Sequence, residues 1–388
     1  MKAPILGLRC IKGLAFIGAW VYAQRQCPVD KTFLRIPSSF SGLVFRSYPE
    51  DHSEDTLWVP VVVHVIESYA NEIPSERVGA QLRALNRDFA PARIQFYLPR
   101  YGPSGEPTCG LTRTVSPLSS HDWSTEEDTL KNLIYWAPDS FLNIWVVRSM
   151  PMQVIGYARA LNDPQAKAGI VLVAGVLGEG EGVRPPYDRG RTAVHEMGHV
   201  FSLYHPFEGG CRGMTPQTCA IEGDEICDTP PQRQATYGCP RTPPNTCQET
   251  PIDLPDPIHN FMGYVDDSCM THFTPEQIAR MRAFLRFHGS TLISQANQLA
   301  RGRTTPFDHV CTELMGISTP FIAPPKLKRK GNTLFVEGAE ELKVYDVAGR
   351  LLHQTRGDEI CIDALPFGLY YLQVFKTGYP FTYTIAPF

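Results

Sequence analysis

Three histidines and a glutamate stand close together in the segment HEMGHVFSLYH, which runs from His195 to His205. His195 and His199 are four residues apart, so on a helix both imidazoles project from one face toward a single ion. Glu196 follows His195 and can lie beside a water molecule that the ion activates, where it would act as a base. Zinc lowers the pKa of such a water to about 7 and polarises a carbonyl group, so the segment predicts hydrolytic zinc chemistry.

The third histidine requires the chain to turn, because His205 lies six residues beyond His199 and a continuing helix would carry it away from the ion. In the metzincin proteases, which this motif resembles, a glycine in a left-handed conformation makes the turn. Here Ser202 stands at that position, at a cost of roughly 1–2 kcal/mol. A zinc site is worth about 10–16 kcal/mol in small domains and can absorb this cost. We therefore expect His205 to be the third ligand, with Glu208 or Glu222 as the alternative if Ser202 prevents the turn.

Segments on both sides of the histidines resemble the pappalysins, and within them the bacterial cytophagalysin-like metalloproteases. The resemblance covers about residues 57–285 and includes the segments VPVVVHVIES, LNRDF, LNIWVV, IGYARA, GRTAVHEMGHVFSLYHPF, GDEICDTP and NFMGYVDDSCMTHFTPEQ. It implies an α/β (α+β) metzincin-like catalytic domain with a mixed twisted sheet and an active-site helix. It also implies that the chain is a zinc metalloendopeptidase acting on protein or peptide substrates.

The resemblance assigns roles to individual residues. Met262 would lie in a Met-turn and form the hydrophobic floor under the zinc, and the Tyr264 hydroxyl would stabilise the oxyanion. Glu196 would take the proton of the attacking water and deliver it to the leaving amine. The alternative is an exported adhesin or binding protein with a structural or decayed metal site. A structural zinc site, however, is usually closed by a fourth protein ligand, and Glu196 would have no role in one.

Cysteines and carboxylates follow the histidines. Ten cysteines come after Cys10, and six of them lie in residues 211–269. In an exported chain this density indicates disulfides, and the absence of a CxxC pair argues against a cysteine zinc cluster. The resemblance implies the pairs Cys211–Cys247 and Cys239–Cys269, which leaves Cys219 and Cys227 as a candidate for a further bridge. Cys109 and Cys311 are another candidate pair, and the sequence does not determine the pairing of Cys109, Cys219, Cys227, Cys311 and Cys361.

The segment GDEICDT resembles the loop where relatives bind calcium. Asp224, Asp228 and Thr229 offer hard oxygen ligands, which suit Ca²⁺. A turn with solvated carboxylates is the alternative interpretation. A structural calcium ion therefore joins the catalytic zinc ion as a candidate cofactor.

The first residues are typical of an export signal. Lys2, Arg9 and Lys12 form a positive n-region before an apolar stretch at 13–23 that is too short to span a bilayer. We expect a signal peptide at residues 1–23, with an amphipathic helix of the fold as the alternative. No later stretch reaches transmembrane length, and a net charge of -4 with a pI near 6.3 gives no electrostatic case for a nucleic-acid partner. The mature protein is therefore expected to be secreted or at the cell surface.

Composition and periodicity divide the rest of the chain. Residues 24–56 contain several prolines without sustained periodicity and are expected to form a pro-segment. Residues 57–316 form the predicted catalytic domain, with a helix from Ser75 to Phe89 that Ser75 caps, and with strands at 59–66, 94–98, 142–147 and 170–173. Residues 317–330 form a proline-rich and then basic linker.

After the linker, residues 331–388 show short strands separated by turns and predict a small all-β sandwich. LKVYDVAGR and LPFGLYYLQVF resemble the sorting domains of proteins exported by the type 9 system of Bacteroidetes, although the ending YTIAPF lacks the basic terminus common there. The resemblance implies export machinery as a partner. A β-sandwich added for binding is the alternative.

Cys27 stands alone in the pro-segment. A thiolate in the open coordination position of the zinc would displace the catalytic water and keep a zymogen latent. Some relatives are held latent in this way. The alternative is a disulfide from Cys27 to Cys109, Cys311 or Cys361.

Overall fold

The structure, a computed structural model, describes residues 20–23, 55–163, 167–249, 252–303, 327–330, 333–346, 351–362, 370–376 and 379–385. Cys27, Cys311, nearly all of the expected pro-segment and most of the expected linker lie outside these residues. Within the part that the structure describes, no helix combines the length and the apolar character that a membrane span needs.

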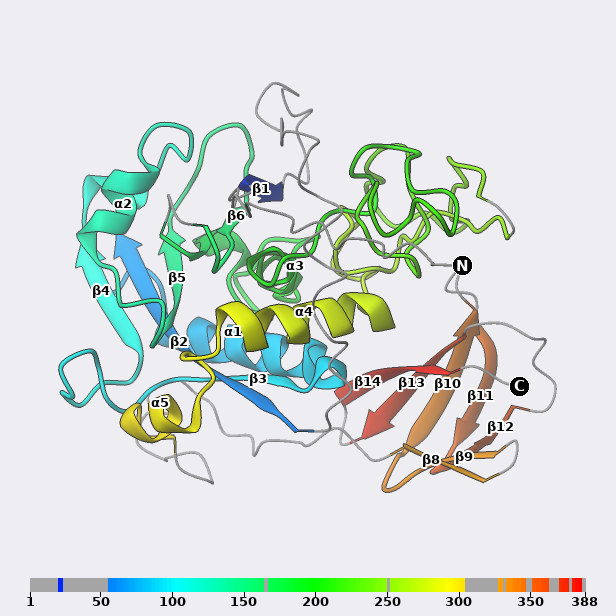
Figure 1. Ribbon diagram of the computed structural model, residues 1–388. Helices are drawn as coiled ribbons and strands as arrows, with labels where there is room; N and C mark the ends of the chain where they lie inside the picture. Colours follow the sequence, from blue (N-terminus) through cyan, green and yellow to red (C-terminus); the bar gives the residue numbers. More distant parts are fainter. Residues whose placement is uncertain are drawn as a thin grey trace, which may run out of the picture.

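A mixed sheet forms the centre of the N-terminal region (Figure 1). Its strand order is β1–β6–β7–β5–β2–β3, and β4 also pairs with β2. The neighbours of β2 run parallel to it and β7 runs parallel to β5, whereas β6 is antiparallel to β7 and to β1. The strands are β1 (Trp20–Ala23), β2 (Leu57–Glu67), β3 (Ile94–Tyr97), β4 (Leu111–Val115), β5 (Leu142–Val147), β6 (Gly156–Arg159) and β7 (Gly169–Val173). The expected α/β layer with a mixed sheet is confirmed.

The run of β-branched residues in β2 is almost wholly buried, because both faces of this part of the sheet are covered. Apolar side chains of three helices join one core with β2, β3, β5 and β7. These helices are α1 (Ser75–Asp88), α3 (Arg191–Val200) and α4 (Pro275–His288), and α2 (Glu127–Leu133) and α5 (Gln295–Ala300) complete the helices of this region. Helix α3 packs on β6, β7 and α1, so the sheet and α1 together position the histidine motif.

The expected cap of α1 is wrong. Pro74 is the N-cap residue and Ser75 is the first helical residue, without a side-chain cap. The Ser75 hydroxyl instead accepts a hydrogen bond of 2.9 Å from the guanidinium of Arg113 on β4. The Ser75 hydroxyl therefore binds Arg113 instead of capping the helix as the sequence pattern predicts.

Between α3 and α4 the described residues form turns and loops without a helix or strand. Three disulfides join this segment: Cys211–Cys247, Cys219–Cys227 and Cys239–Cys269. The first and third are the pairs that the resemblance implies, and the second is a pair that the sequence left open. Cys109 is also disulfide-bonded. The long segment is therefore held by covalent links instead of by regular structure.

The C-terminal region contains two antiparallel sheets, with strand orders β11–β10–β13–β14 and β12–β9–β8. Leu334, Val336, Leu342, Val344, Ile360 and Leu372 from these sheets share one apolar cluster. The strands are β8 (Leu327–Lys330), β9 (Thr333–Val336), β10 (Glu341–Asp346), β11 (Leu351–Arg356), β12 (Glu359–Cys361), β13 (Tyr370–Lys376) and β14 (Tyr379–Ile385). β8 occupies the end of the expected linker, and its polar sequence LKRK lacks the alternation that would predict a strand.

Candidate metal centre

Helix α3 carries His195, Glu196 and His199, and every residue of this helix is buried. The helix ends at Val200, and Ser202 then adopts φ 74°, in the left-handed region. The N–H of Leu203 donates to the carbonyl of Gly198 at 2.9 Å, which closes the turn and sends the chain back along the helix. The bend that the spacing requires is therefore made at Ser202, in a strained conformation for a residue with a side chain.

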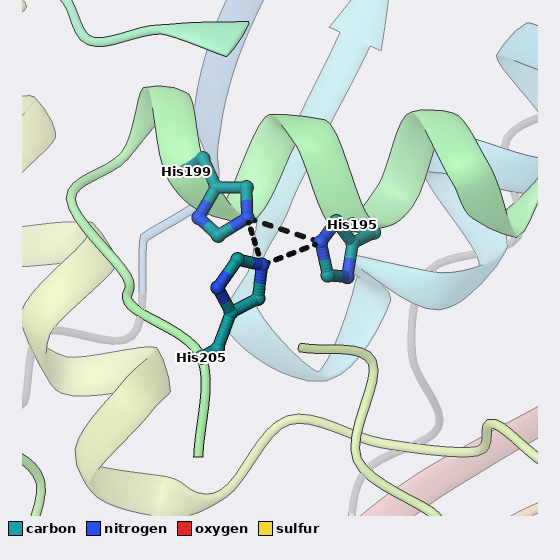
Figure 2. Close-up of side chains that lie close together, drawn as sticks. All are labelled: His195, His199 and His205. Atoms are coloured by element: carbon teal, nitrogen blue, oxygen red, sulfur yellow. Dashed lines mark hydrogen bonds between the residues drawn. The ribbon is translucent and has the colours of Figure 1, made fainter. Parts of the chain in front are cut away.

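The turn brings His205 to the other two histidines (Figure 2). The Nε2 atoms of His195 and His199 are 3.0 Å apart, those of His199 and His205 are 3.0 Å apart, and those of His195 and His205 are 3.2 Å apart. Among the described residues, these three form the one group of metal-binding side chains whose ligand atoms converge. Neither Glu208 nor Glu222 belongs to this group.

The hydrogen bonds of the Nδ1 atoms determine whether the Nε2 atoms of His195 and His199 carry a proton or a lone pair. His195 donates through Nδ1 to the carbonyl of Phe261 at 2.8 Å, and His199 donates through Nδ1 to the carbonyl of Leu203 at 2.7 Å. A carbonyl oxygen can only accept, so in both neutral rings the proton is on Nδ1 and the Nε2 lone pair points inward. Lone pairs that face each other at this distance repel unless a cation lies between them.

The three imidazoles fit a zinc ion. Ligand nitrogens of tetrahedral zinc lie about 3.3 Å apart when each Zn–N bond is about 2.05 Å, close to the separations found here. Burial lowers the pKa of His199 to about 3, and burial followed by the proximity of His199 holds the pKa of His205 well below its usual range. Both rings are therefore neutral at neutral pH, which is the form that binds a metal.

Glu196 lies against β6, the strand next to the edge strand β1. A β-carbon added to Gly156 of β6 would come within 2.9 Å of the Glu196 Oε1 atom. β1 pairs with β6 along its outer side, with Ala23 opposite Gly156. This strand contains the end of the expected signal peptide, so cleavage after Ala23 would remove β1 and expose the edge of β6 beside Glu196.

Met262 lies under the histidine helix and is fully buried. A β-carbon added to Gly198 would come within 2.4 Å of the Met262 sulfur and 3.4 Å of the Phe273 ring. Only the absence of a side chain at Gly198 lets the helix approach Met262 this closely. The methionine therefore packs against the histidine helix, while its role as a floor under a zinc ion stays a prediction.

Tyr264 lies beside two of the three histidines. Its ring centre is 4.9 Å from that of His205 and 5.6 Å from that of His195. Phe207 stacks on His205 at 4.5 Å and contacts Tyr264 at 4.9 Å. Aromatic rings thus line the His205 side of the site.

The acidic loop after the histidines is largely buried. Asp224 is 5% exposed, and its Oδ2 atom has no hydrogen-bond partner among the described residues. Burial raises the pKa of Asp224 well above its usual range and raises that of Asp228 to about 6. Burial, together with the nearby Glu225, also raises the pKa of Glu208. Carboxyl groups in such surroundings favour either protonation or a bound cation.

The structure packs Glu196, Met262 and Tyr264 around the three histidines and places Asp224, Asp228 and Thr229 together in a separate loop. Sequence reasoning missed Gly156 and Gly198, whose missing side chains make room for Glu196 and Met262. The glycine inside HEMGH was a usable signal, since glycine within a helix costs about 1 kcal/mol and calls for a packing reason. Gly156 had no comparable signal.

Comparisons with known proteins cover the same region. Residues 130–286 match the family model Peptidase_M43, described as pregnancy-associated plasma protein-A. An extracellular metalloprotease of Pyricularia oryzae is 35% identical over 236 residues, covering 59% of this chain and 75% of the relative. One from Arthroderma otae is 30% identical over 283 residues, covering 70% of this chain and 94% of the relative.

A solved structure is similar as well. Mature mirolysin of Tannerella forsythia, in complex with a cleaved peptide, aligns with a TM-score of 0.56 at 29% identity. The alignment covers 64% of this chain and 99% of that chain. A second mirolysin structure, in complex with a small compound, aligns with a TM-score of 0.55 at 30% identity.

Proposed function

This chain belongs to the pappalysin family of metalloproteases, and we propose that His195, His199 and His205 are the ligands of its catalytic zinc ion. It is a secreted zinc metalloendopeptidase. The observation that carries the ligand assignment is the convergence of three buried Nε2 atoms within 3.0–3.2 Å of one another. Nothing in the site or among the relatives favours an adhesin.

A zinc ion held by these three histidines would supply an acidified water and would polarise the substrate carbonyl. Glu196 follows a ligand on the same helix and accepts the proton of the attacking water, then donates it to the leaving amine. The Tyr264 hydroxyl donates to the developing oxyanion. Met262 supports the helix from below, and Phe207 and Tyr264 keep bulk water from the His205 side.

Substrate binding is best supported along β6. The support is that β1 pairs antiparallel with β6, with Ala23 opposite Gly156 and therefore close to Glu196. A peptide that adds to a sheet edge gains main-chain hydrogen bonds whatever its sequence, which suits an endopeptidase. Such a peptide would place one of its carbonyl groups near the proposed zinc.

The decisive variant is Glu196→Ala. It is expected to bind zinc stoichiometrically and to melt at the wild-type temperature, while peptide hydrolysis falls by at least about 10²–10⁴-fold, the usual contribution of a general base. Zinc content by atomic absorption and turnover of a quenched fluorescent peptide are the measurements. Glu106→Ala, which removes an exposed glutamate, is the matched control. Near-wild-type turnover in a zinc-loaded Glu196→Ala protein would refute the role of Glu196 as the general base.

We propose further that the loop containing Asp224, Asp228 and Thr229 binds calcium. The support is the unpartnered and buried Oδ2 atom of Asp224, with raised pKa values at both aspartates. A hard cation would stabilise both groups as carboxylates. Calcium added to protein prepared without it is expected to raise the melting temperature of the wild type but not of Asp224→Asn. A wild-type melting temperature that does not change when calcium is added would refute the proposed calcium site.

The remaining proposals concern processing. Residues 1–23 act as the signal peptide and 24–56 as a pro-segment, in which Cys27 holds the zymogen latent by binding the zinc. The catalytic domain spans 57–316 and is followed by the linker at 317–330.

Residues 331–388 form a β-sandwich that export machinery of the type 9 kind recognises. Support comes from the apolar cluster that the two C-terminal sheets share and from the VYDVAGR resemblance. N-terminal sequencing and mass measurement of the exported protein test the removal of the signal peptide after Ala23 and the removal of the pro-segment after residue 56.

A further inference from the structure

The N-terminus of the active-site helix is capped from a distant segment. Gly190, the N-cap residue of α3, has φ 68° and no side chain to cap with. The N–H groups of Arg189 and Arg191 instead donate to the Oδ2 atom of Asp267, at 2.9 Å and 3.2 Å. Asp267 is fully buried and lies five residues after Met262. A carboxylate at this end of a helix also interacts favourably with the helix dipole.

Arg191 makes a second link between the same two segments. Its Nη1 atom donates to the backbone carbonyl of Asp267 at 2.6 Å, and its guanidinium lies 5.5 Å from the ring of Phe261. The carbonyl of Phe261 accepts the Nδ1 proton of His195, one helical turn further along α3. The first turn of α3 is thus attached to the segment around Met262 at both Asp267 and Phe261.

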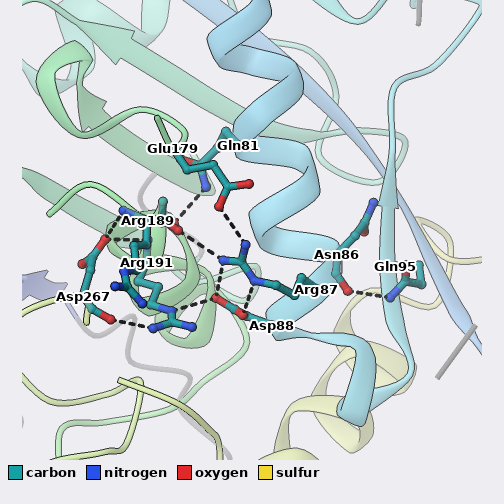
Figure 3. A network of polar contacts seen from close by, with 10 residues as sticks. Gln81, Asn86, Arg87, Asp88, Gln95, Glu179, Arg189, Arg191 and Asp267 are labelled. Carbon is teal, nitrogen blue, oxygen red and sulfur yellow. Dashed lines mark hydrogen bonds and ion pairs between the residues drawn. The ribbon is translucent and has the colours of Figure 1, made fainter. Parts of the chain in front are cut away.

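Helix α1 also contacts Arg191 and the loop before it (Figure 3). Asp88 accepts from Nε of Arg191 at 3.1 Å and pairs with Arg87, whose Nη1 atom donates to Glu179 at 2.7 Å. Although burial opposes ionisation, the two guanidinium groups hold the pKa of Asp88 below its usual value. Gln81 donates to the carbonyl of Gly190 at 2.9 Å. The contacts come from α1, the loop before α3 and the segment after Met262.

We propose that Asp267 is a positioning residue for the catalytic centre, acting through Arg191 and the first turn of α3. By fixing the rotation of this turn against the Met262 segment, it sets the direction of the His195 ring and of the Glu196 carboxylate. Asp267 touches neither the substrate nor the proposed zinc. The inference rests on the zinc site proposed above, and it adds a residue that the histidine motif does not include.

The test compares Asp267→Ala and Asp267→Asn with Ser268→Ala, an exposed neighbour, each prepared as the exported and processed protein. In Asp267→Ala we expect zinc affinity and kcat each to fall by about tenfold or more, as when the support of a metal ligand is removed, with KM changed less than about twofold. The visible absorption of the cobalt-substituted protein is expected to shift. Asp267→Asn keeps an oxygen for both N–H groups, so it is expected to restore the wild-type spectrum and most of kcat.

If Asp267→Ala does not fold, Arg191→Lys takes its place. A lysine ammonium can reach Asp88 or the Asp267 carbonyl but cannot span both, so the same cobalt shift and kcat loss are expected. Wild-type spectra, zinc affinity and kcat in either folded variant would overturn the positioning role. His205→Ala tests the ligand set separately, because undiminished zinc binding in that variant would refute the zinc site and not the role of Asp267.

Discussion

Ser202 is the residue where local preference and metal geometry conflict. Its φ of 74° lies in the left-handed region, which costs a residue with a side chain about 1–2 kcal/mol. Glycine would remove that strain, although it would also lower stability by about 0.4–1 kcal/mol through the freer unfolded chain. This strained turn is the one that brings His205 to the other two histidines.

We therefore expect Ser202→Gly to raise the free energy of unfolding by up to about 1 kcal/mol, or roughly 2 °C in melting temperature, with zinc affinity unchanged or tighter. Differential scanning calorimetry and competition with a zinc chelator are the measurements. A fall in both quantities would mean that the side chain of Ser202 supports the bend, and it would weaken the assignment of His205.

Gly198 presents the opposite case, in which a missing side chain is required. An added β-carbon would lie 2.4 Å from the sulfur of Met262. Gly198→Ala is expected to cost about 1–3 kcal/mol of stability through overpacking and to lower zinc affinity as the helix moves. In a Met262→Ala background the same substitution is expected to cost much less, because the sulfur is gone. Equal costs in the two backgrounds, measured by urea unfolding, would contradict the close packing.

At the scale of elements, the described residues between α3 and α4 have tertiary anchors but form no helix or strand. Asp228 accepts from the N–H of Glu276 at 2.9 Å, and Glu276 accepts from the N–H of Cys227 at 2.7 Å, so the acidic loop is joined to the start of α4. The Cys219–Cys227 bridge spans eight residues and encloses Asp224. Its position indicates that it shapes the acidic loop.

Removing this bridge in Cys219→Ser/Cys227→Ser is expected to lower stability by about 2.5 kcal/mol, against about 4 kcal/mol for Cys211→Ser/Cys247→Ser with its longer loop. Calcium stabilisation, however, is expected to be lost mainly in the Cys219/Cys227 variant, because this bridge closes a short loop around Asp224, whereas Cys211–Cys247 closes a much longer one. Thermal melting with and without calcium separates the two effects. Equal calcium responses in both variants would show that the bridge does not shape the site.

At the scale of the whole molecule, a buried histidine joins the strands of the central sheet. His64 on β2 contacts Thr112 of β4 at 2.8 Å and Asn143 of β5 at 2.9 Å, between the rings of Trp136 and Trp145. Burial lowers its pKa to about 4. The unfolded chain therefore binds this proton between about pH 6.5 and pH 4 while the folded chain does not, so stability is lost as pH falls through this window.

The expected contribution of His64 to this loss is roughly 3 kcal/mol between pH 6.5 and pH 4. His64→Gln is expected to lower stability at pH 7 but to reduce the acid dependence, so the two curves of unfolding free energy against pH converge toward pH 4. His353→Gln, at an exposed histidine, is the matched control. Parallel curves for wild type and His64→Gln in urea titrations would contradict a neutral buried His64.

Short-range patterns in the sequence determined much of this protein. The apolar run in β2 and the helical spacing in α1 predict their elements because burial imposes a period on the chain. The spacing of His195, His199 and His205 predicts their convergence. Two of them share a helix face, and the third reaches the same ion if the helix ends and the chain turns after His199. The disulfides implied by the resemblance also match the bonds in the structure.

Other features depend on contacts between segments far apart in the chain, and no periodicity reports these. Ser75 loses its capping role because Arg113, on another strand, takes its hydroxyl. Gly156 is needed because the tertiary fold brings Glu196 against β6. Asp267 caps α3 from 76 residues away. The sequence by itself thus determined which residues could hold a metal, whereas the tertiary structure decided what holds those residues in place, because burial and hydrogen bonding act through space.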